Sequence, residues 1–236
     1  MKKAMSVCAA SFVILFFWGG SGLAQETFPN AGLWLAHWQE DIRPFWDNAA
    51  AMGDPEGNYP TFRNQGGKPT SESDRYSRML SRQVYTYSIG YALTGDGTLL
   101  QKARAGIDWL LAHAKHPQFG YYPILDEKGR GRAVRGVRSG IKWNGSLWGD
   151  NEEWESKAHF WKNGYHETEH ALVLYLLSCQ LQEQLAVLYF AVPAEKTAAF
   201  QPQPYLFQGQ EISRADLGAI KGTALKKLKI GFDSLH

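Results

Sequence analysis

The segment that most constrains the fold is FWKNGYHETEHALVLYLL, residues 160–177. His166 and His170 are four residues apart, so on a helix they lie one above the other on the same face. The turns that follow are apolar all round, which is typical of a helix that is buried on every side. The segment therefore predicts a buried helix that carries two imidazoles and two carboxylates, Glu167 and Glu169, at its N-terminal end. Such groups often mark a functional site, although a helix cap and a hydrogen-bonded core histidine would also explain them.

The first 24 residues have the pattern of a targeting segment. Two lysines near the start precede an apolar run over residues 7–18, and Gly-Leu-Ala at residues 22–24 matches a signal-peptidase site. The apolar run is shorter than a transmembrane helix needs. We therefore expect export to the periplasm or the extracellular space, and no membrane association after cleavage.

The composition is that of a folded protein whose basic and acidic residues are nearly equal in number. The chain has 236 residues, 44% of them hydrophobic, and we expect residues 25–236 to form a single domain. Removal of the targeting segment takes away two lysines and no acids, which leaves 23 Lys plus Arg against 23 Asp plus Glu. This balance gives no sign of a nucleic-acid partner. Cys179 would be the single remaining cysteine, so no internal disulfide is expected.

Further helices are predicted over residues 30–52, 74–94 and 98–115, because apolar residues recur there at helical spacing. A last amphipathic helix is predicted from Ser213 to about Leu228. A loop pattern also repeats with an offset of 63 residues, which predicts a repeated helix–loop–helix unit. The repeated positions are Trp46, Gly57, Tyr59, Pro60, Phe62 and Gly66, matched by Trp109, Gly120, Tyr122, Pro123, Leu125 and Gly129. The expected fold class is all-α, a toroid of helical hairpins whose same-side loops surround a central pocket.

Several segments resemble the family of N-acylglucosamine 2-epimerases and cellobiose 2-epimerases. Residues 74–88, DRYSRMLSRQVYTYS, are similar to an aromatic-rich family helix built around an Arg-Gln pair, and YALTGD at residues 91–96 is similar to the turn that follows it. WKNGYH at residues 161–166 looks like the family's late motif, whose histidine is a catalytic acid/base. The resemblance covers roughly residues 30–130 and 158–178, and the family's middle segment has no counterpart in this chain.

The resemblance implies an (α/α)6 barrel, a free mono- or disaccharide as substrate, and neither an organic cofactor nor a metal. It assigns to His166 the role of acid/base and to Arg82 a contact with the substrate oxygens. Glu169 and His170 are added as partner groups because of their position beside His166. The expected sugar-binding side chains are Arg82, Tyr59, Trp161 and Tyr165.

Because the chain offers fewer helices than a full barrel needs, we expect an incomplete toroid. A homodimer would cover its open apolar helix faces. The expected chemistry is removal of the proton at carbon 2, beside the carbonyl of the open sugar, and its return on the other face. Histidine suits this work as a base, and a cation beside the carbonyl oxygen would stabilise the enediolate. The family's other catalytic histidines lie in the missing middle segment, so the sequence does not decide whether the site is fully active.

Two other functions fit the sequence. Residues 166–170, HETEH, match the H-E-x-x-H pattern of zinc peptidases, with zinc on His166 and His170 and with Glu167 as general base. Glu183 or Glu195 could then supply a third ligand. The other alternative is a helical-toroid protein that binds carbohydrate without catalysis, which the missing middle segment favours.

Overall fold

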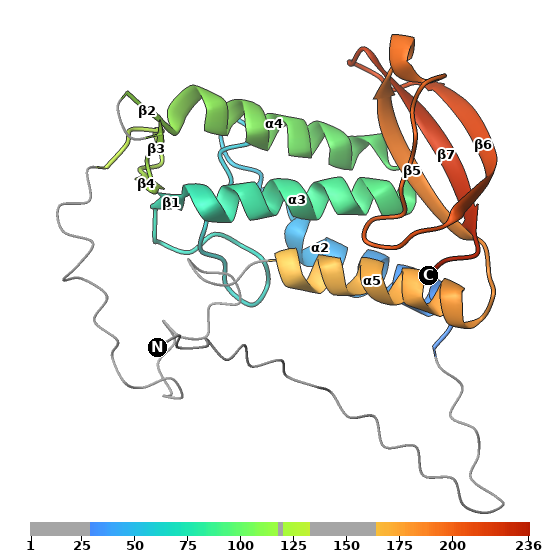
Figure 1. Cartoon of the computed structure of the whole chain (residues 1–236). Helices are drawn as coiled ribbons and strands as arrows, with labels where there is room; N and C mark the ends of the chain where they lie inside the picture. Colours follow the sequence, from blue (N-terminus) through green and yellow to red (C-terminus); the bar gives the residue numbers. More distant parts are fainter. Residues whose placement is uncertain (1–28, 118–119, 133–163) are drawn as a thin grey trace, which may run out of the picture.

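The computed structural model describes residues 29–117, 120–132 and 164–236. The proposed targeting segment, residues 1–24, and Trp161 lie outside these ranges. The described residues combine long helices with a C-terminal antiparallel sheet (Figure 1). None of the helices in these ranges is both long and apolar enough to span a bilayer.

The first helical rod is shorter than the predicted helix over residues 30–52. Asn30 caps it by accepting a hydrogen bond from the backbone N–H of Leu33. The rod consists of α1 (Ala31–His37), the π-helical turn η1 (Trp38–Ile42) and α2 (Arg43–Trp46). A separate 3-10 turn, η2 (Ala49–Ala51), follows it.

The buried side chain of Arg63 caps the C-terminal end of α2. Its guanidinium is fully buried and donates hydrogen bonds to the backbone oxygens of Phe45, Trp46 and Ala51. The last carbonyls of a helix lack partners within the helix, so a side-chain donor satisfies them. Burial lowers the pKa of Arg63. The Trp46 ring also faces the guanidinium, with 5.1 Å between Cζ and the ring centroid.

The three longest helices agree closely with the sequence prediction. They are α3 (Ser77–Thr94), α4 (Gly97–His113) and α5 (Tyr165–Leu181). Gly95 ends α3 in the left-handed conformation, and Asp96 caps α4 by accepting from the N–H of Thr98. Asp96 also pairs with Arg43, 2.6 Å between Oδ2 and Nη2, which ties α2 to the α3–α4 turn.

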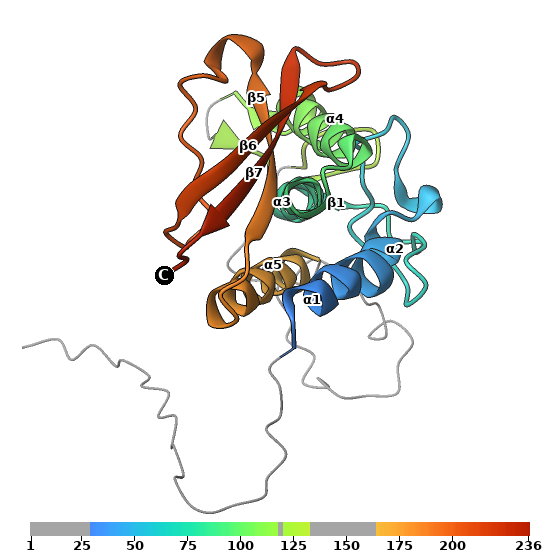
Figure 2. The ribbon, with the colours of Figure 1, turned by 90° about the vertical axis from the view of Figure 1, so that its right-hand side faces the viewer.

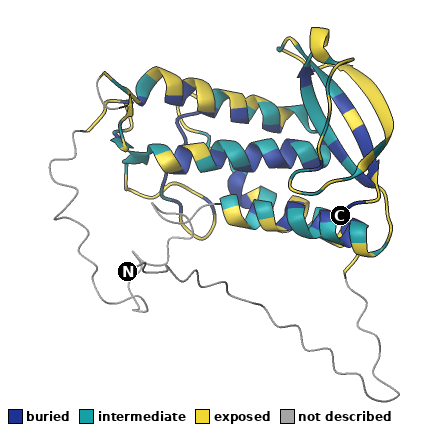
Figure 3. Ribbon diagram, in the orientation of Figure 1, coloured by how far each residue is buried: buried dark blue, intermediate teal, exposed yellow. Residues whose placement is uncertain are grey.

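Helix α3 lies at the centre of the fold. It packs against α4 on one side and against α5 on the other, where α5 also lies along α1 (Figures 1 and 2). The buried surfaces of these helices face one another, whereas the outer side of α4 is exposed (Figure 3). Helix α5 was predicted to be buried on every side, but Val173, Leu174 and Leu177 are half-buried.

The prediction of an all-α toroid is wrong, because the C-terminal third of the described chain is a three-stranded antiparallel sheet. Its strands are β5 (Ala186–Pro193), β6 (Gln210–Ala219) and β7 (Leu225–Asp233), in the order β5-β7-β6. In β5 and β7, Leu188 pairs with Ile230 and Ala186 with Phe232, and these apolar side chains are buried. Strand β5 packs against α3 and closes one end of the helical layer.

The predicted helix from Ser213 to Leu228 is therefore also wrong. The segment is rich in Ala, Leu and Lys, which favour helices as isolated residues. In the structure Leu228, Ile230 and Phe232 alternate with Lys229 and its neighbours, so every second side chain reaches the core. A turn that contains Gly222 at a φ of 74° separates β6 from β7. Backbone pairing of β6 with β7, together with burial of the β7 side chains, outweighs the weak helical preference of the sequence.

The repeated loop pattern corresponds to two hairpins with matching backbone hydrogen bonds, although not to units of a ring. Two pairs of two-residue strands also lie here: β1 (Arg75–Tyr76) with β4 (Ile124–Leu125), and β2 (Lys115–His116) with β3 (Gly120–Tyr121). In the hairpins the offset is one residue less than the 63 residues of the sequence pattern. The matching bonds are Asn64 N to Lys68 O with Asp126 N to Arg130 O, and Thr70 N to Phe62 O with Arg132 N to Ile124 O.

Replacement of Gly90 by alanine tests the central position of α3. A Cβ atom at Gly90 would lie 2.3 Å from the buried ring of Trp38. Gly90→Ala should therefore lower the free energy of unfolding by about 1–3 kcal/mol, because overpacking outweighs the gain in helix propensity. Urea unfolding measures this change. Gly97→Ala, where the nearest atom is 3.6 Å from the added Cβ, is the matched control and should be neutral or stabilising. Equal effects of the two substitutions would contradict the packing described here.

Candidate functional site

Four of the predicted site residues come together where α3 and α5 lie side by side. Arg82 projects from the second turn of α3, and Tyr165, His166 and Glu169 occupy the first turns of α5. Gly164, just before α5, lets the start of α5 lie against the end of α2, because a Cβ there would lie 2.3 Å from Nε1 of Trp46. We refer to Arg82, Tyr85, Tyr165, His166, Glu169 and Tyr205 as the α3–α5 cluster.

One part of the cluster is a stack of planar groups. The Arg82 guanidinium lies over the Tyr165 ring, with 5.5 Å from Cζ to the ring centroid. On α3, Tyr85 contacts the same Tyr165 ring with 4.4 Å between the two centroids. A cation above an aromatic face is attracted by the electrons of the ring. The stack therefore holds a positive charge beside the start of α5.

The other part of the cluster is a chain of polar contacts that crosses three elements. The hydroxyl of Tyr85 on α3 donates to Oη of Tyr205, at 2.8 Å. The hydroxyl of Tyr205, which belongs to the connection between β5 and β6, donates to Oε1 of Glu169 on α5. Oε2 of Glu169 lies 4.0 Å from Nδ1 of His166. The His166 side chain is 72% exposed and that of Glu169 is 27% exposed, so the chain of contacts runs from the interior to the surface.

The tyrosines of this chain are held in the protonated form. Burial raises the pKa of Tyr205, and its hydrogen bond to the Glu169 carboxylate raises it further. The pKa of Tyr85 is raised by burial first and then by its hydrogen bond to Tyr205. Both phenols therefore act as hydrogen-bond donors around neutral pH. Tyr85 donates to Tyr205, and Tyr205 donates to Glu169.

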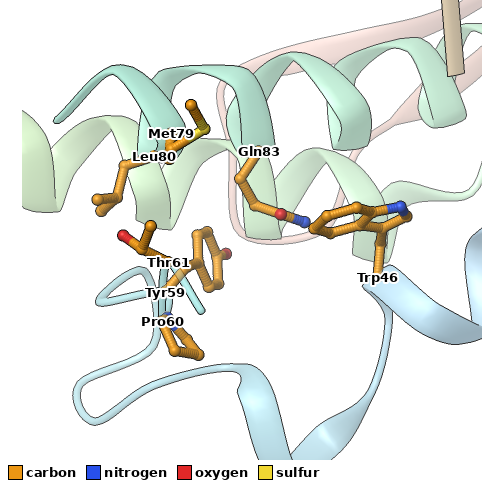
Figure 4. A pocket seen from close by; sticks show the side chains of 7 residues that line it. All are labelled: Trp46, Tyr59, Pro60, Thr61, Met79, Leu80 and Gln83. Carbon is orange, nitrogen blue, oxygen red and sulfur yellow. The ribbon is translucent and has the colours of Figure 1, made fainter. Parts of the chain in front are cut away.

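Tyr59 and His170 lie apart from the cluster contacts. Tyr59 is 1% exposed, and its hydroxyl donates to the backbone oxygen of Lys102 at 2.6 Å. It lines a small cavity with Trp46 and Gln83 (Figure 4), whose volume of about 10 Å³ for the centre of a water-sized sphere suits a single water rather than a sugar. His170 is exposed, and its ring packs edge-on against Trp34, with 5.7 Å between the ring centroids.

The proposed zinc ligands do not gather in the described part of the chain. Within residues 29–117, 120–132 and 164–236, no three His, Cys, Asp or Glu side chains meet in a group that could hold a metal ion. Glu183 follows the C-terminal end of α5, about 20 Å of helix rise from His170. Glu195 lies in the 3-10 turn η4 (Ala194–Lys196), after β5. No contact in these ranges thus favours the peptidase alternative.

Comparisons with protein-family models, with curated proteins and with solved structures give no match to this chain. Its function has to be argued from the chemistry of the cluster itself.

Two members of the cluster were missed by sequence reasoning. Tyr85 follows Arg82 by three residues, so helical spacing could have placed both on one face of α3. Tyr205 carries no comparable signal, because it lies in a proline-rich connection that the sequence marks as irregular. The strand pairing of β5 and β6 with β7 fixes where that connection begins and ends.

Replacement of Glu169 by glutamine should lower the pKa of Tyr205. The substitution keeps an acceptor oxygen but removes the negative charge that opposes ionisation of the phenol. Burial remains, so the pKa should stay above that of a free tyrosine. Titration of 13C-labelled tyrosine ring carbons by NMR measures the change. Glu183→Gln, at the other end of α5, is the control and should leave the Tyr205 titration in place. An unchanged titration in Glu169→Gln would contradict the hydrogen bond.

Proposed function

We propose that this chain catalyses proton transfer at carbon 2 of a free mono- or disaccharide, as a sugar 2-epimerase-like isomerase with His166 as the acid/base. The observation that carries the proposal is the convergence of Arg82 and Tyr165 with His166 and Glu169 across α3 and α5. A base, a carboxylate beside it and a nearby cation are the groups that proton abstraction next to a carbonyl requires. The proposal depends on these side chains and not on a toroidal fold.

The proposed reaction begins with the open form of the sugar. His166 Nδ1 is turned toward Glu169, which leaves Nε2 as the nitrogen that takes the proton from carbon 2. The electrons of the broken C–H bond form the carbon–carbon double bond of an enediolate, and the carbonyl oxygen takes up the negative charge. Arg82 stabilises this charge, and the Glu169 carboxylate stabilises the imidazolium. Rotation about the bond between carbons 2 and 3 then turns the other face of the enediolate toward His166, and return of the proton from Nε2 to that face of carbon 2 gives the epimer and restores the carbonyl.

The mixture of aromatic and polar side chains in the cluster supports a sugar as the substrate class. Sugars present C–H groups on one face and hydroxyls at their edges, and aromatic rings with polar neighbours are complementary to both. The cluster combines one guanidinium with one carboxylate, Arg82 with Glu169, which suits a neutral polyhydroxylated ligand better than a strongly charged one.

Carbohydrate binding without catalysis is the second candidate. It is favoured by the 72% exposure of the His166 side chain, because proton abstraction beside a carbonyl benefits from exclusion of water. The two candidates share the same residues and differ in whether the proton at carbon 2 leaves the sugar.

Proton exchange at carbon 2 separates the two candidates. The purified protein is incubated in heavy water with mannose, N-acetylglucosamine and cellobiose, with and without a chelator, and the sugar is followed by NMR. Isomerase function predicts loss of the carbon-2 proton signal, insensitive to the chelator. His166→Ala should reduce the exchange rate at least about a hundredfold, as expected for the loss of a general base.

His170→Ala is the matched control, because it removes the other imidazole of the same helix face outside the cluster contacts. Its exchange rate should stay within about threefold of the unmodified protein. Sugar-induced shifts in the Tyr165 ring signals without exchange would establish the binding role instead. Absence of both exchange and shifts would contradict the proposed function for these sugars.

A further inference from the structure

Tyr205 has a backbone conformation that tyrosine seldom adopts. Its φ is 58°, in the left-handed region where a Cβ atom is disfavoured and Gly or Asn is the usual residue. The N–H of Tyr205 bonds to the oxygen of Gln203 at 2.9 Å, and the N–H of Phe207 bonds to that of Pro204 at 3.1 Å. Tyr205 thus occupies the first central position of a tight turn. A left-handed turn position is usually filled by Gly or Asn, so a tyrosine here is explained by what its side chain contacts.

The connection that carries Tyr205, residues 194–209, is anchored on both sides of the turn, before it by β6 and after it by the C-terminal residue that follows β7. Arg214 on β6 donates to the backbone oxygens of Thr197 and Phe200, at 2.9 and 2.8 Å. Farther along, Gln208 and His236 exchange two backbone hydrogen bonds, at 2.9 and 3.0 Å. The sheet therefore fixes the position from which Tyr205 reaches α3 and α5.

We propose that Tyr205 is a positioning residue of the site, whose hydroxyl holds the Glu169 carboxylate in the orientation that faces His166. The proposal rests on the proposed function for its catalytic meaning, while the positioning itself is a property of the unliganded protein. It makes the C-terminal sheet part of the site, through a residue that acts on another side chain rather than on the sugar.

The geometry of Glu169 explains why such a residue is useful. Glutamate has three rotatable side-chain bonds, and at 27% exposure its carboxylate has water as an alternative partner. The hydrogen bond from Tyr205 fixes Oε1, and this leaves Oε2 directed toward Nδ1 of His166, 4.0 Å away. Tyr85 in turn fixes the Tyr205 hydroxyl by donating to it. The 4.0 Å between Oε2 and Nδ1 is too long for a hydrogen bond, but the negative charge beside Nδ1 still favours a proton on that nitrogen, and Nε2 is the nitrogen turned away from the carboxylate.

The test compares Tyr205→Phe with Leu206→Ala. Tyr205→Phe removes only the hydroxyl and keeps both the ring and the backbone conformation. Leu206, the next residue of the turn, is 76% exposed and serves as the control. Two properties are measured: kcat and KM for exchange at carbon 2, and the 15N shifts of the His166 ring at about pH 9, where a histidine is ordinarily neutral. Thermal unfolding of each variant reports whether the fold is intact.

Tyr205→Phe should lower kcat for exchange by about tenfold to a hundredfold, the range expected when a reacting group is misplaced, with KM within about twofold. The 15N shifts should show a smaller share of the Nδ1-protonated tautomer than in the unmodified protein. Leu206→Ala should change neither property. Tyr205→Asn, which suits the left-handed backbone and also lacks the phenol hydroxyl, should lower kcat in the same way, measured at a temperature at which thermal unfolding shows that the variant is folded.

Two results would overturn the inference. Full exchange activity in Tyr205→Phe, in a protein whose His166→Ala variant is inactive, would show that Glu169 needs no positioning while the proposed function stands. If the unmodified protein shows no exchange, the proposed isomerase fails, and the 15N shifts decide the positioning alone. Unchanged shifts in Tyr205→Phe would then overturn it, and a changed tautomer ratio would support it.

Discussion

The fold depends on aromatic rings that pack directly against glycine backbone. At several glycines, ring atoms lie so close that a Cβ atom would fall within 3 Å of an aromatic carbon or nitrogen. These contacts include Gly90 with Trp38, Gly106 with Tyr59, and Gly164 with Trp46. Each one draws helices or loops closer than ordinary side chains permit. Through Trp38 and Trp46, which lie in the first helical rod, this packing holds both α3 and the start of α5 against that rod.

The helical part of the fold could be read from the sequence because its signals are local. Gly95 and Asp96 mark the end of α3 and the start of α4, and the apolar periodicity between such caps needs no knowledge of distant residues. The sheet could not be read in the same way. Residues 213–228 carry a helical composition, and their strand conformation is set by partners in β5 and β7 that stabilise it only after the chain has folded.

The same division applies to the cluster. Arg82 and His166 were expected from the family resemblance and Glu169 from its position beside His166. The structure brings them together with Tyr165, while their roles stay predictions. Tyr59 illustrates the limit of such reasoning, because a tyrosine that suits a sugar also suits a core, and its hydroxyl satisfies a backbone carbonyl in the interior. Tyr205 could not be predicted from the sequence, because the pairing of β5 and β6 with β7 is what places its connection beside α5.

The hydroxyl of Tyr205 joins the connection between β5 and β6 to α5 at Glu169, and the site as described depends on this contact. A double-mutant cycle on the free energy of unfolding, with Tyr205→Phe, Glu169→Gln and the double variant, tests it most directly. A hydrogen bond to a charged group predicts a coupling of about 1 kcal/mol at neutral pH. Additivity of the two single substitutions within about 0.3 kcal/mol would contradict the claim.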